Sequence, residues 1–183
     1  MDNVFPILEQ YCNYMLAVLA RSELTVKEYE YDLICFFRFY KRDHGLVDKG
    51  MPLEQISIDD VDSKLLSKIT TDDLLVFLIW LTRERKLSPA SRARRIATLK
   101  SFFKYCHSKK HILESNPAYD LETPRIGKRV PKYLTLEEST KLLSTAYESP
   151  SATNVRDYCI LTLFLNCGMR LSELRGINTD DIH

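Results

Sequence analysis

Apolar residues recur every three or four positions along most of the chain, and short polar breaks separate these stretches, which is the pattern of amphipathic helices. The Thr25–Glu28 pair has the spacing of a capping box, a common start signal of a helix. Gly45 follows the same stretch, and a glycine there is a common end signal. The pattern predicts helices over about 4–20, from Thr25 to about Asp43, within 59–67, and from Thr70 or Thr71 to about Arg85.

A further helix is predicted over the stretch LSPASRARRIATLKSFFKYC, beginning at Ser88 and Pro89. Serine is a favoured N-cap, and a proline at the first helical position gives up no helical hydrogen bond. At 100° per residue, one side of this helix should face the core with Ile96, Leu99, Phe103 and Cys106. The opposite side should carry Arg94, Thr98, Lys100, Ser101 and Lys104, while Arg92 and Arg95 fall nearer the apolar stripe.

The segment ETPRIGKRVPKY, residues 122–133, combines two prolines and a glycine with four basic residues. Proline disfavours a helix at its own position and at the residue before it, so the segment reads as an extended linker. We therefore predict a helical domain of four or five helices over 1–120, a basic linker over 121–132, and the opening of a second domain over 133–183. About fifty residues are few for an independent domain.

Start and stop signals recur beyond the linker. Thr135 and Glu138 have capping-box spacing and predict a helix to about Tyr147. Asn154 is the expected N-cap of a strongly apolar helix, and Gly168 is expected to end it.

Positive charge is concentrated in one part of the chain. Residues 83–132 contain fourteen Lys or Arg and four Asp or Glu, a local net charge of +10. The rest of the chain contains twelve basic and twenty-one acidic residues, a net charge of −9, so the total of +1 hides the asymmetry. Such asymmetry is typical of a surface that binds a polyanion. The alternative is a solvated helix face followed by a charged linker.

Composition narrows the class of protein. With 45% hydrophobic and 28% charged residues, the chain has an ordinary globular mixture. Its apolar runs are far shorter than the roughly 20 residues of a membrane span, and its N-terminus is acidic, unlike a signal peptide. We expect a soluble cytoplasmic protein with no membrane partner. The five cysteines form no C-x-x-C pair and predict buried, reduced thiols and no metal site.

Arg170 lies at a predicted joint between two helices, in the stretch CGMRLSELRGI. It follows the helix-ending Gly168 and precedes Ser172, which we expect to cap the next helix. Backbone N–H groups at a helix start favour anions, and a guanidinium matches the oxygens of a phosphate. The alternative is a surface arginine at an ordinary turn.

Several stretches, in this order, resemble the tyrosine recombinase (phage integrase) family. CGMRLSELRGI is similar to the family's T-G-[LM]-R-x-S-E-[LI] motif. LTVKEYEYDLICFFRFY, LSPASRARRIATLKSFFKY and ILESNPA resemble segments of the family's core-binding domain. The resemblance implies a mainly α fold: a SAM-like helical core-binding domain, followed by the mostly helical beginning of the catalytic domain.

The resemblance also implies a function. Members of the family break and rejoin DNA strands at specific sites through a 3′-phosphotyrosyl intermediate, without metal or other cofactor, as tetramers on two duplexes. By this resemblance Arg170 is the first catalytic arginine and Glu173 supports a catalytic side chain, although Glu173 could equally be only an acid at a helix start. The basic side chains expected to hold double-stranded DNA, with one serine among them, are Arg92, Arg94, Arg95, Lys100, Ser101, Lys104, Lys128, Arg129 and Lys132.

The remaining motifs of the family's active site are missing from this sequence. None of the four histidines begins an H-x-x-R motif, and all ten tyrosines precede Arg170. We therefore expect an N-terminal fragment of a recombinase that is monomeric, binds DNA and is catalytically inactive. Two other classes remain open: a stand-alone DNA-binding regulator, and a helical protein-interaction domain whose basic stretch is only solvated.

Overall fold

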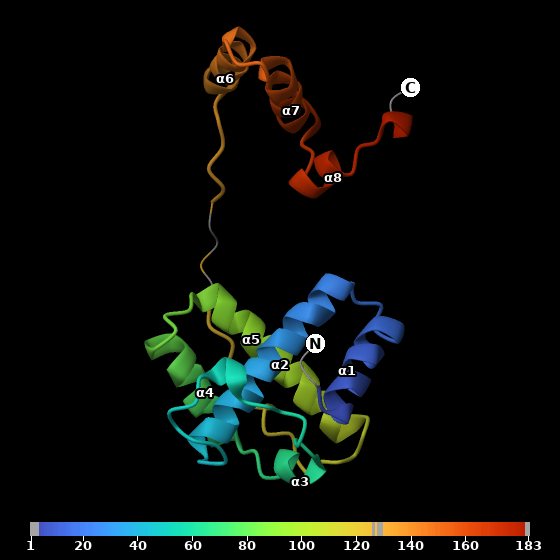
Figure 1. Ribbon diagram of the computed structural model, residues 1–183, viewed down its shortest axis with the longest axis vertical. Coiled ribbons are helices and arrows are strands. Elements are labelled where there is room, and N and C mark those ends of the chain that lie inside the picture. Colours follow the sequence, from blue (N-terminus) through green and yellow to red (C-terminus); the bar gives the residue numbers. More distant parts are fainter. Residues whose placement is uncertain (1–3, 126, 128–129, 182–183) are drawn as a thin grey trace. The chain divides into compact units, whose positions relative to one another are not determined.

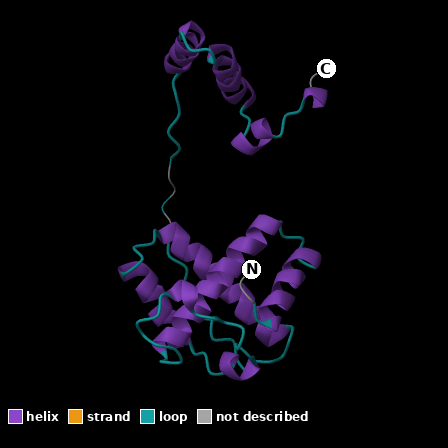
Figure 2. Ribbon diagram, viewed as in Figure 1, coloured by secondary structure: helices purple, strands orange, loops and turns teal. Residues whose placement is uncertain are grey.

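Most helix boundaries follow from the residues around them. The computed structural model describes residues 4–125, 127 and 130–181. The described residues contain helices and loops and no strand (Figure 2). The chain divides into two compact units, Met1–Gly127 and Lys128–His183, and the division falls within the predicted linker.

The first unit contains five α-helices and one short 3₁₀ helix in its described part (Figure 1). They are α1 (Pro6–Ala17), α2 (Glu23–Asp43), η1 (Leu53–Gln55), α3 (Ser63–Leu66), α4 (Thr71–Arg83) and α5 (Pro89–Ser108). The described part of the second unit contains α6 (Leu136–Glu148), α7 (Asn154–Cys167), α8 (Leu171–Arg175) and η2 (Thr179–Asp181). The predicted mainly α fold is confirmed.

Three of the predicted start signals are confirmed by their hydrogen bonds. Ser88 caps α5 by accepting from the backbone N–H of Ser91. Thr70 caps α4, and Thr135 caps α6 in a capping box with Glu138. The end signal of α7 is confirmed too, because Gly168 has φ of +62°, a backbone conformation that favours glycine.

Three predicted caps were wrong. Helix α2 begins earlier than expected, because Ser22 caps it by accepting from the backbone N–H of Thr25, which is itself helical. Both residues are good caps, and the earlier one adds a turn to the helix. Thr153, not Asn154, precedes α7, and Arg170 itself, not Ser172, occupies the N-cap position of α8.

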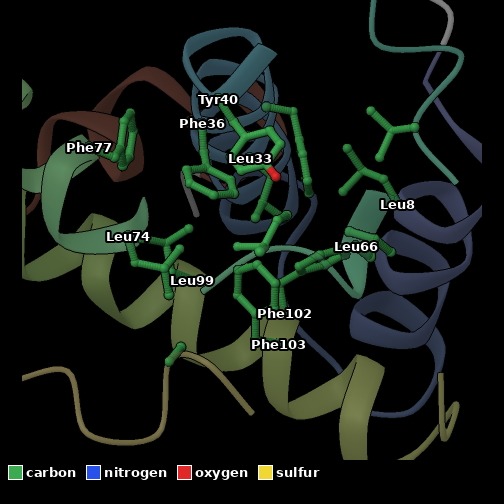
Figure 3. Packing of buried hydrophobic residues seen from close by; sticks show 14 of the residues in the cluster. Leu8, Leu33, Phe36, Tyr40, Leu66, Leu74, Phe77, Leu99, Phe102 and Phe103 are labelled. Atoms are coloured by element: carbon green, nitrogen blue, oxygen red, sulfur yellow. The ribbon is translucent and has the colours of Figure 1, made fainter. Parts of the chain in front are cut away.

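A single aromatic-rich core holds the first unit together. Helix α2 lies at its centre and contacts α1, η1, α4 and α5. Figure 3 shows side chains from α1 to α5 meeting in this core, among them Phe36 of α2, Phe77 of α4 and Phe102 of α5. Phe36 packs edge-on against Phe77 with ring centroids 5.2 Å apart, and Phe37 packs in the same way against Phe102 at 5.8 Å. Such contacts add to the free energy of simple apolar burial.

Helix α5 is buried on more than the predicted side. Its expected core residues are all buried, as predicted: Ile96, Leu99, Phe103 and Cys106. Thr98, expected on the opposite side, is completely buried, so that expectation was wrong. The error arises because α2 packs against the side of α5 that carries Thr98, where the Thr98 hydroxyl bonds Asp32 of α2.

The second unit has no buried side chain in its described residues 130–181. Helices α6 and α7 pack against each other, with the rings of Tyr147 and Tyr158 at 5.4 Å and the Asn154 amide donating to the Tyr147 carbonyl at 3.0 Å. These contacts form a helical hairpin in which the described side chains are at most half-buried.

The cysteines only partly follow their prediction. All five are free thiols, and Cys106 is buried while Cys12 and Cys35 are half-buried. Cys159 and Cys167 are exposed, which contradicts the expectation of burial, because α7 has no core to face. Among the described helices, none is both long and apolar enough to cross a membrane.

Candidate nucleic-acid interface and catalytic arginine

An ion-pair cluster joins α2 to α5 across 62 residues of sequence, and its centre is the buried carboxylate of Asp32. Arg94 approaches both oxygens of this carboxylate, with Nη1 2.8 Å from Oδ2 and Nη2 3.1 Å from Oδ1. Nη1 of Arg94 also lies 3.0 Å from Oε2 of Glu28 and donates to the Glu28 backbone carbonyl at 3.3 Å. Arg94 therefore ties α5 to two successive turns of α2.

Arg95 is the buried member of the same cluster. Its side chain is 9% exposed, its Nε lies 3.4 Å from Oδ1 of Asp32, and its guanidinium lies 5.9 Å from the ring centre of Tyr31. Nε and Nη1 are buried without a hydrogen-bond partner among the described residues. Arg95 thus balances the charge of Asp32 from inside the unit and presents little surface to a ligand.

The carboxylate of Asp32 is held by opposing effects. Burial raises the pKa of Asp32 above its ordinary value, while Arg95, Arg94 and a hydrogen bond from Thr98 act against that rise. The Thr98 hydroxyl donates to Oδ2 at 3.1 Å, which explains why this polar side chain is buried. A buried charge is tolerated when it is paired and hydrogen-bonded in this way.

The other predicted DNA-binding residues of α5 differ in their availability. Arg92 is half-buried and donates to the Thr82 hydroxyl at 2.8 Å, and Ser101 accepts a hydrogen bond from Tyr11 at 2.7 Å. Lys100 is half-buried and Lys104 is exposed. Within the described part of the chain, neither lysine makes an ion pair, so their charges can meet a ligand.

Lys104 lies at an open groove between the end of α5 and the loop that follows it. The other residues that line the groove are polar or aromatic: His107, Ser108, Glu114, Ser115, Asn116, Tyr119 and Asp120. The groove therefore mixes one lysine with two acids. Among the described residues, no group of three or more His, Cys, Asp and Glu side chains could hold a metal ion.

Of the DNA-binding residues predicted in the linker, one is described by the structure. Lys132 is exposed, whereas Lys128 and Arg129 lie outside the described residues. Arg125, which belongs to the same basic segment but was not among the predicted residues, is exposed as well. The high positive charge of residues 83–132 was the signal that could have included it.

Sequence reasoning also missed the two acids that bind Arg94. Glu28 and Asp32 are four residues apart on α2 and therefore share one face of that helix. This spacing was a usable signal that the face carries negative charge. Nothing in the spacing indicated that α5 would bring Arg94 against it.

Arg170 and Glu173 form the best-defined feature of the second unit. Glu173 accepts from the backbone N–H of Arg170 at 2.7 Å and from its Nη1 at 2.9 Å. These contacts lower the pKa of Glu173. The Arg170 side chain is 82% exposed, so Glu173 orients the guanidinium while leaving most of it open to a ligand. The backbone N–H of Arg170 is already bonded, however, and is not available to an anion as the sequence had suggested.

The predicted site residues thus fall into two separate groups. The α5 and linker residues belong to a basic part of the chain, and the Arg170–Glu173 pair lies in the second unit. Exposed lysines suit the phosphates of a nucleic-acid backbone, and an oriented, exposed guanidinium suits the oxygens of one phosphate group.

Comparison with known proteins identifies relatives along nearly the whole chain. Residues 58–110 match the family described as phage integrase, N-terminal SAM-like domain. "Tyrosine recombinase XerC" of Caldanaerobacter subterraneus subsp. tengcongensis is 48% identical over 177 residues, which are 97% of this chain and 49% of that protein. "Tyrosine recombinase" of Pseudothermotoga lettingae is 32% identical over 96% of this chain and 53% of its own length.

Among solved structures, a match carries the description "Crystal structure of XerA recombinase". It covers 97% of this chain and 51% of that chain, with a TM-score of 0.42 and 21% sequence identity. The chain spans about half the length of the curated relatives it matches.

Proposed function

Because the chain belongs to the tyrosine recombinase (phage integrase) family, we propose that it supplies the DNA-binding part and the first catalytic arginine of a site-specific DNA recombinase. The complete enzyme would cleave one strand by attack of a tyrosine on a phosphate, form a 3′-phosphotyrosyl link, and rejoin the strand to a new partner. The energy of the broken bond is kept in that link, so rejoining needs no external source.

The observation that carries this proposal is the geometry of Arg170. Glu173 accepts a hydrogen bond from Nη1 of the guanidinium and another from the backbone N–H of the same residue, so it anchors the guanidinium at one nitrogen. A guanidinium oriented in advance can stabilise the charge that develops on the non-bridging oxygens of the attacked phosphate. Glu173 in this role is a positioning residue for Arg170.

The chain alone is proposed to be inactive. Cleavage needs a nucleophile and proton-transfer groups, and no tyrosine or H-x-x-R motif follows Arg170 in this sequence. One arginine stabilises charge but forms no covalent bond to DNA. We propose that the complete recombinase acts as a tetramer on two duplexes, and that the 183-residue chain binds DNA as a monomer.

The proposed DNA contact runs along α5 and the basic segment after it. Lys100, Lys104 and Lys132 have side chains that reach solvent and make no ion pair within the described ranges. Each phosphate that such a lysine neutralises releases counterions, so affinity should fall steeply with salt. Lys128 and Arg129 are proposed contacts on their sequence position alone.

The decisive experiment compares Arg170→Ala with Arg175→Ala in a recombinase that contains this chain. Arg175 is an exposed arginine on the same short helix and is therefore a matched control. We expect Arg170→Ala to slow strand cleavage by roughly 10²–10³-fold, as loss of one charge-stabilising donor does, with target binding nearly unchanged. Normal cleavage by Arg170→Ala would show that the assignment of Arg170 is wrong.

A second experiment uses the 183-residue chain itself. Titration with duplex DNA at increasing salt should show binding that weakens with salt, and Lys104→Ala should reduce the salt slope by about one. Denaturing electrophoresis should show no covalent complex with DNA. Absence of salt-dependent binding would favour the protein-interaction alternative.

A further inference from the structure

Two of the predicted DNA-binding arginines already have internal counter-charges. Arg94 and Arg95 bring two positive charges to the α2–α5 cluster, and Asp32 and Glu28 bring two negative charges. The cluster is therefore electrically neutral. Of its two arginines only Arg94 is partly accessible, with 37% of its side chain exposed, whereas Arg95 is buried.

We infer that Asp32 and Glu28 withhold Arg94 from DNA and thereby limit sequence-independent binding by the basic surface around α5. This inference rests on the proposed DNA binding and deepens it, because it states which cations of α5 contribute to affinity. Lys100 and Lys104 contribute, and Arg94 does not.

The first argument for this inference is the geometry around the Arg94 guanidinium. Nη1 lies near Oδ2 of Asp32, Oε2 of Glu28 and the Glu28 carbonyl, at 2.8, 3.0 and 3.3 Å. Nη2 donates to Oδ1 of Asp32 at 3.1 Å. A phosphate would have to displace these oxygens, which already accept from the guanidinium in the paired geometry that arginine prefers.

Electrostatics support it independently. Because Asp32 is buried, its charge is poorly screened by solvent and acts strongly on the neighbouring guanidinium. The Glu28 side chain is 52% exposed, so its carboxylate faces solvent beside Arg94 and would repel an approaching phosphate. Lys104, by contrast, is exposed, and although Glu114 and Asp120 line the same groove, its ammonium group makes no ion pair with any described residue.

Such a device would matter for a protein that must find one site among many. Sequence-independent affinity comes almost entirely from cations that neutralise phosphates, and each additional contact strengthens binding to every duplex alike. Withholding one arginine lowers binding to incorrect sites without changing contacts that read bases. Arg94 meanwhile still positions α5 against α2.

The test is Glu28→Gln in the 183-residue chain, with dissociation constants measured on a random-sequence duplex across a range of salt concentrations. This substitution leaves Arg94 and Arg95 balanced by Asp32 alone, so the cluster gains one net positive charge at an accessible position. We expect the salt slope to steepen by about one and binding to tighten roughly three- to tenfold near 0.1 M salt. Circular dichroism and thermal unfolding verify that the variant is folded.

Two controls separate this effect from a simple change of net charge. Glu54→Gln removes an exposed acid on η1 and should leave the salt slope unchanged. The double variant Glu28→Gln with Arg94→Ala should lose the gain, because the accessible cation is then absent. Unchanged or weaker binding by Glu28→Gln, or a slope reduced by about one in Arg94→Ala alone, would overturn the inference.

The same titration judges the proposed function separately. Wild-type binding, or its absence, tests whether the chain binds DNA at all. The difference between Glu28→Gln and wild type tests the withholding of Arg94. If Glu28→Gln binds a duplex and wild type binds none, the result contradicts DNA binding by the wild-type chain and supports the withholding of Arg94. If neither protein binds a duplex, both proposals are contradicted.

Discussion

The two units of the chain differ in what holds them together. In the described part of the first unit, helices α1 to α5 enclose aromatic side chains such as Phe36, Phe77 and Phe102, all completely buried. In the second unit, α6 and α7 pack side by side and no side chain is buried within residues 130–181. Burial of apolar surface is the main favourable term in folding, so stability resides in the first unit.

The ion pairs show the same contrast. Asp32 and Lys41 of the first unit are buried and pair with residues distant in sequence, although Asp60, the partner of Lys41, is exposed. The pairs Arg156–Asp157 and Arg170–Glu173 of the second unit are largely exposed and local in sequence. A buried pair organises the fold around it, while an exposed pair contributes little stability but leaves its side chains accessible. The first unit is therefore built to hold a shape, and the second presents an accessible arginine.

The largest difference between the two units should be in the free energy of unfolding that is lost when a side chain is truncated. Phe102→Ala should destabilise the first unit by about 3–5 kcal/mol, because it removes a buried ring that packs on Phe37 and Tyr11. Leu163→Ala on the half-buried face of α7 should cost less than about 1.5 kcal/mol. Denaturant unfolding followed by far-UV circular dichroism measures both, and equal losses would refute the contrast in burial.

The next largest difference between the two units should be in the rate at which their cysteines are alkylated. Burial raises the pKa of the Cys106 thiol to about 12, so almost none of it is thiolate at pH 8. Cys159 and Cys167 are exposed. We expect iodoacetamide to modify these two at least about 100-fold faster than Cys106, because the thiolate is the reactive form.

Mass spectrometry of peptides after timed alkylation measures the two rates. Denatured protein, in which all five thiols are accessible, is the control. Equal modification of Cys106 and Cys167 in the native chain would show that the first unit opens as readily as the second.

Removal of one partner of an ion pair should reduce stability by a smaller amount, and by more in the first unit than in the second. The Lys41 side chain is 6% exposed, and its Nζ donates to the Ser57 carbonyl at 2.8 Å and to Asp60 at 2.6 Å. Lys41→Met should destabilise the first unit by about 1–3 kcal/mol, because the loop after η1 loses its attachment to α2. Arg156→Met, its counterpart in the second unit, should change stability by no more than about 0.5 kcal/mol. Thermal unfolding checks both, and similar shifts would count against the contrast.

The smallest effect should be a pH dependence from Asp73. Burial acts to raise the pKa of Asp73, but hydrogen bonds from Thr70 and His44 outweigh it, so this pKa is lowered. A lowered pKa in the folded state stabilises the fold above the ordinary value of 3.8, and this stability is lost as pH falls through the lowered pKa. Asp73→Asn should therefore be less stable by about 1 kcal/mol at pH 6.

The two proteins should converge only as pH falls through the lowered pKa of Asp73, below its ordinary value of 3.8, where the wild-type carboxylate becomes protonated. Unfolding free energies measured from pH 6 down to about pH 2 test this. Asp157→Asn, in the second unit, is the control and should leave the unfolding of the first unit unchanged. A constant difference between Asp73→Asn and wild type at every pH would contradict the role of the ionised carboxylate.

Much of the helical fold was predictable because helix ends depend on nearby residues. Ser88 with Pro89, Thr135 with Glu138, and Gly168 each act within about one turn of the helix they begin or end. Where two good caps lay close together, as at Ser22 and Thr25, local chemistry allowed either position.

The candidate site was predictable only in part. Arg170 was predicted as a site residue from its neighbours in sequence, and its partner Glu173 lies three residues further along the chain. Thr98 was assigned to solvent because periodicity shows only one helix at a time. Its hydroxyl instead bonds Asp32, 66 residues earlier, and no periodic pattern reports on that distance.

The positions of most helices, the concentration of positive charge in residues 83–132 and the family motifs could be read from the sequence, because each depends on short-range pattern or on ordered motifs. Tertiary structure alone decided which charges are available. Periodicity assigned both Arg94 and Lys104 to the side of α5 away from the core, yet packing of α5 on α2 places Arg94 against Asp32 and leaves Lys104 exposed. The physical reason is that an ion pair requires atoms within a few ångströms, and only the folded chain brings distant residues that close.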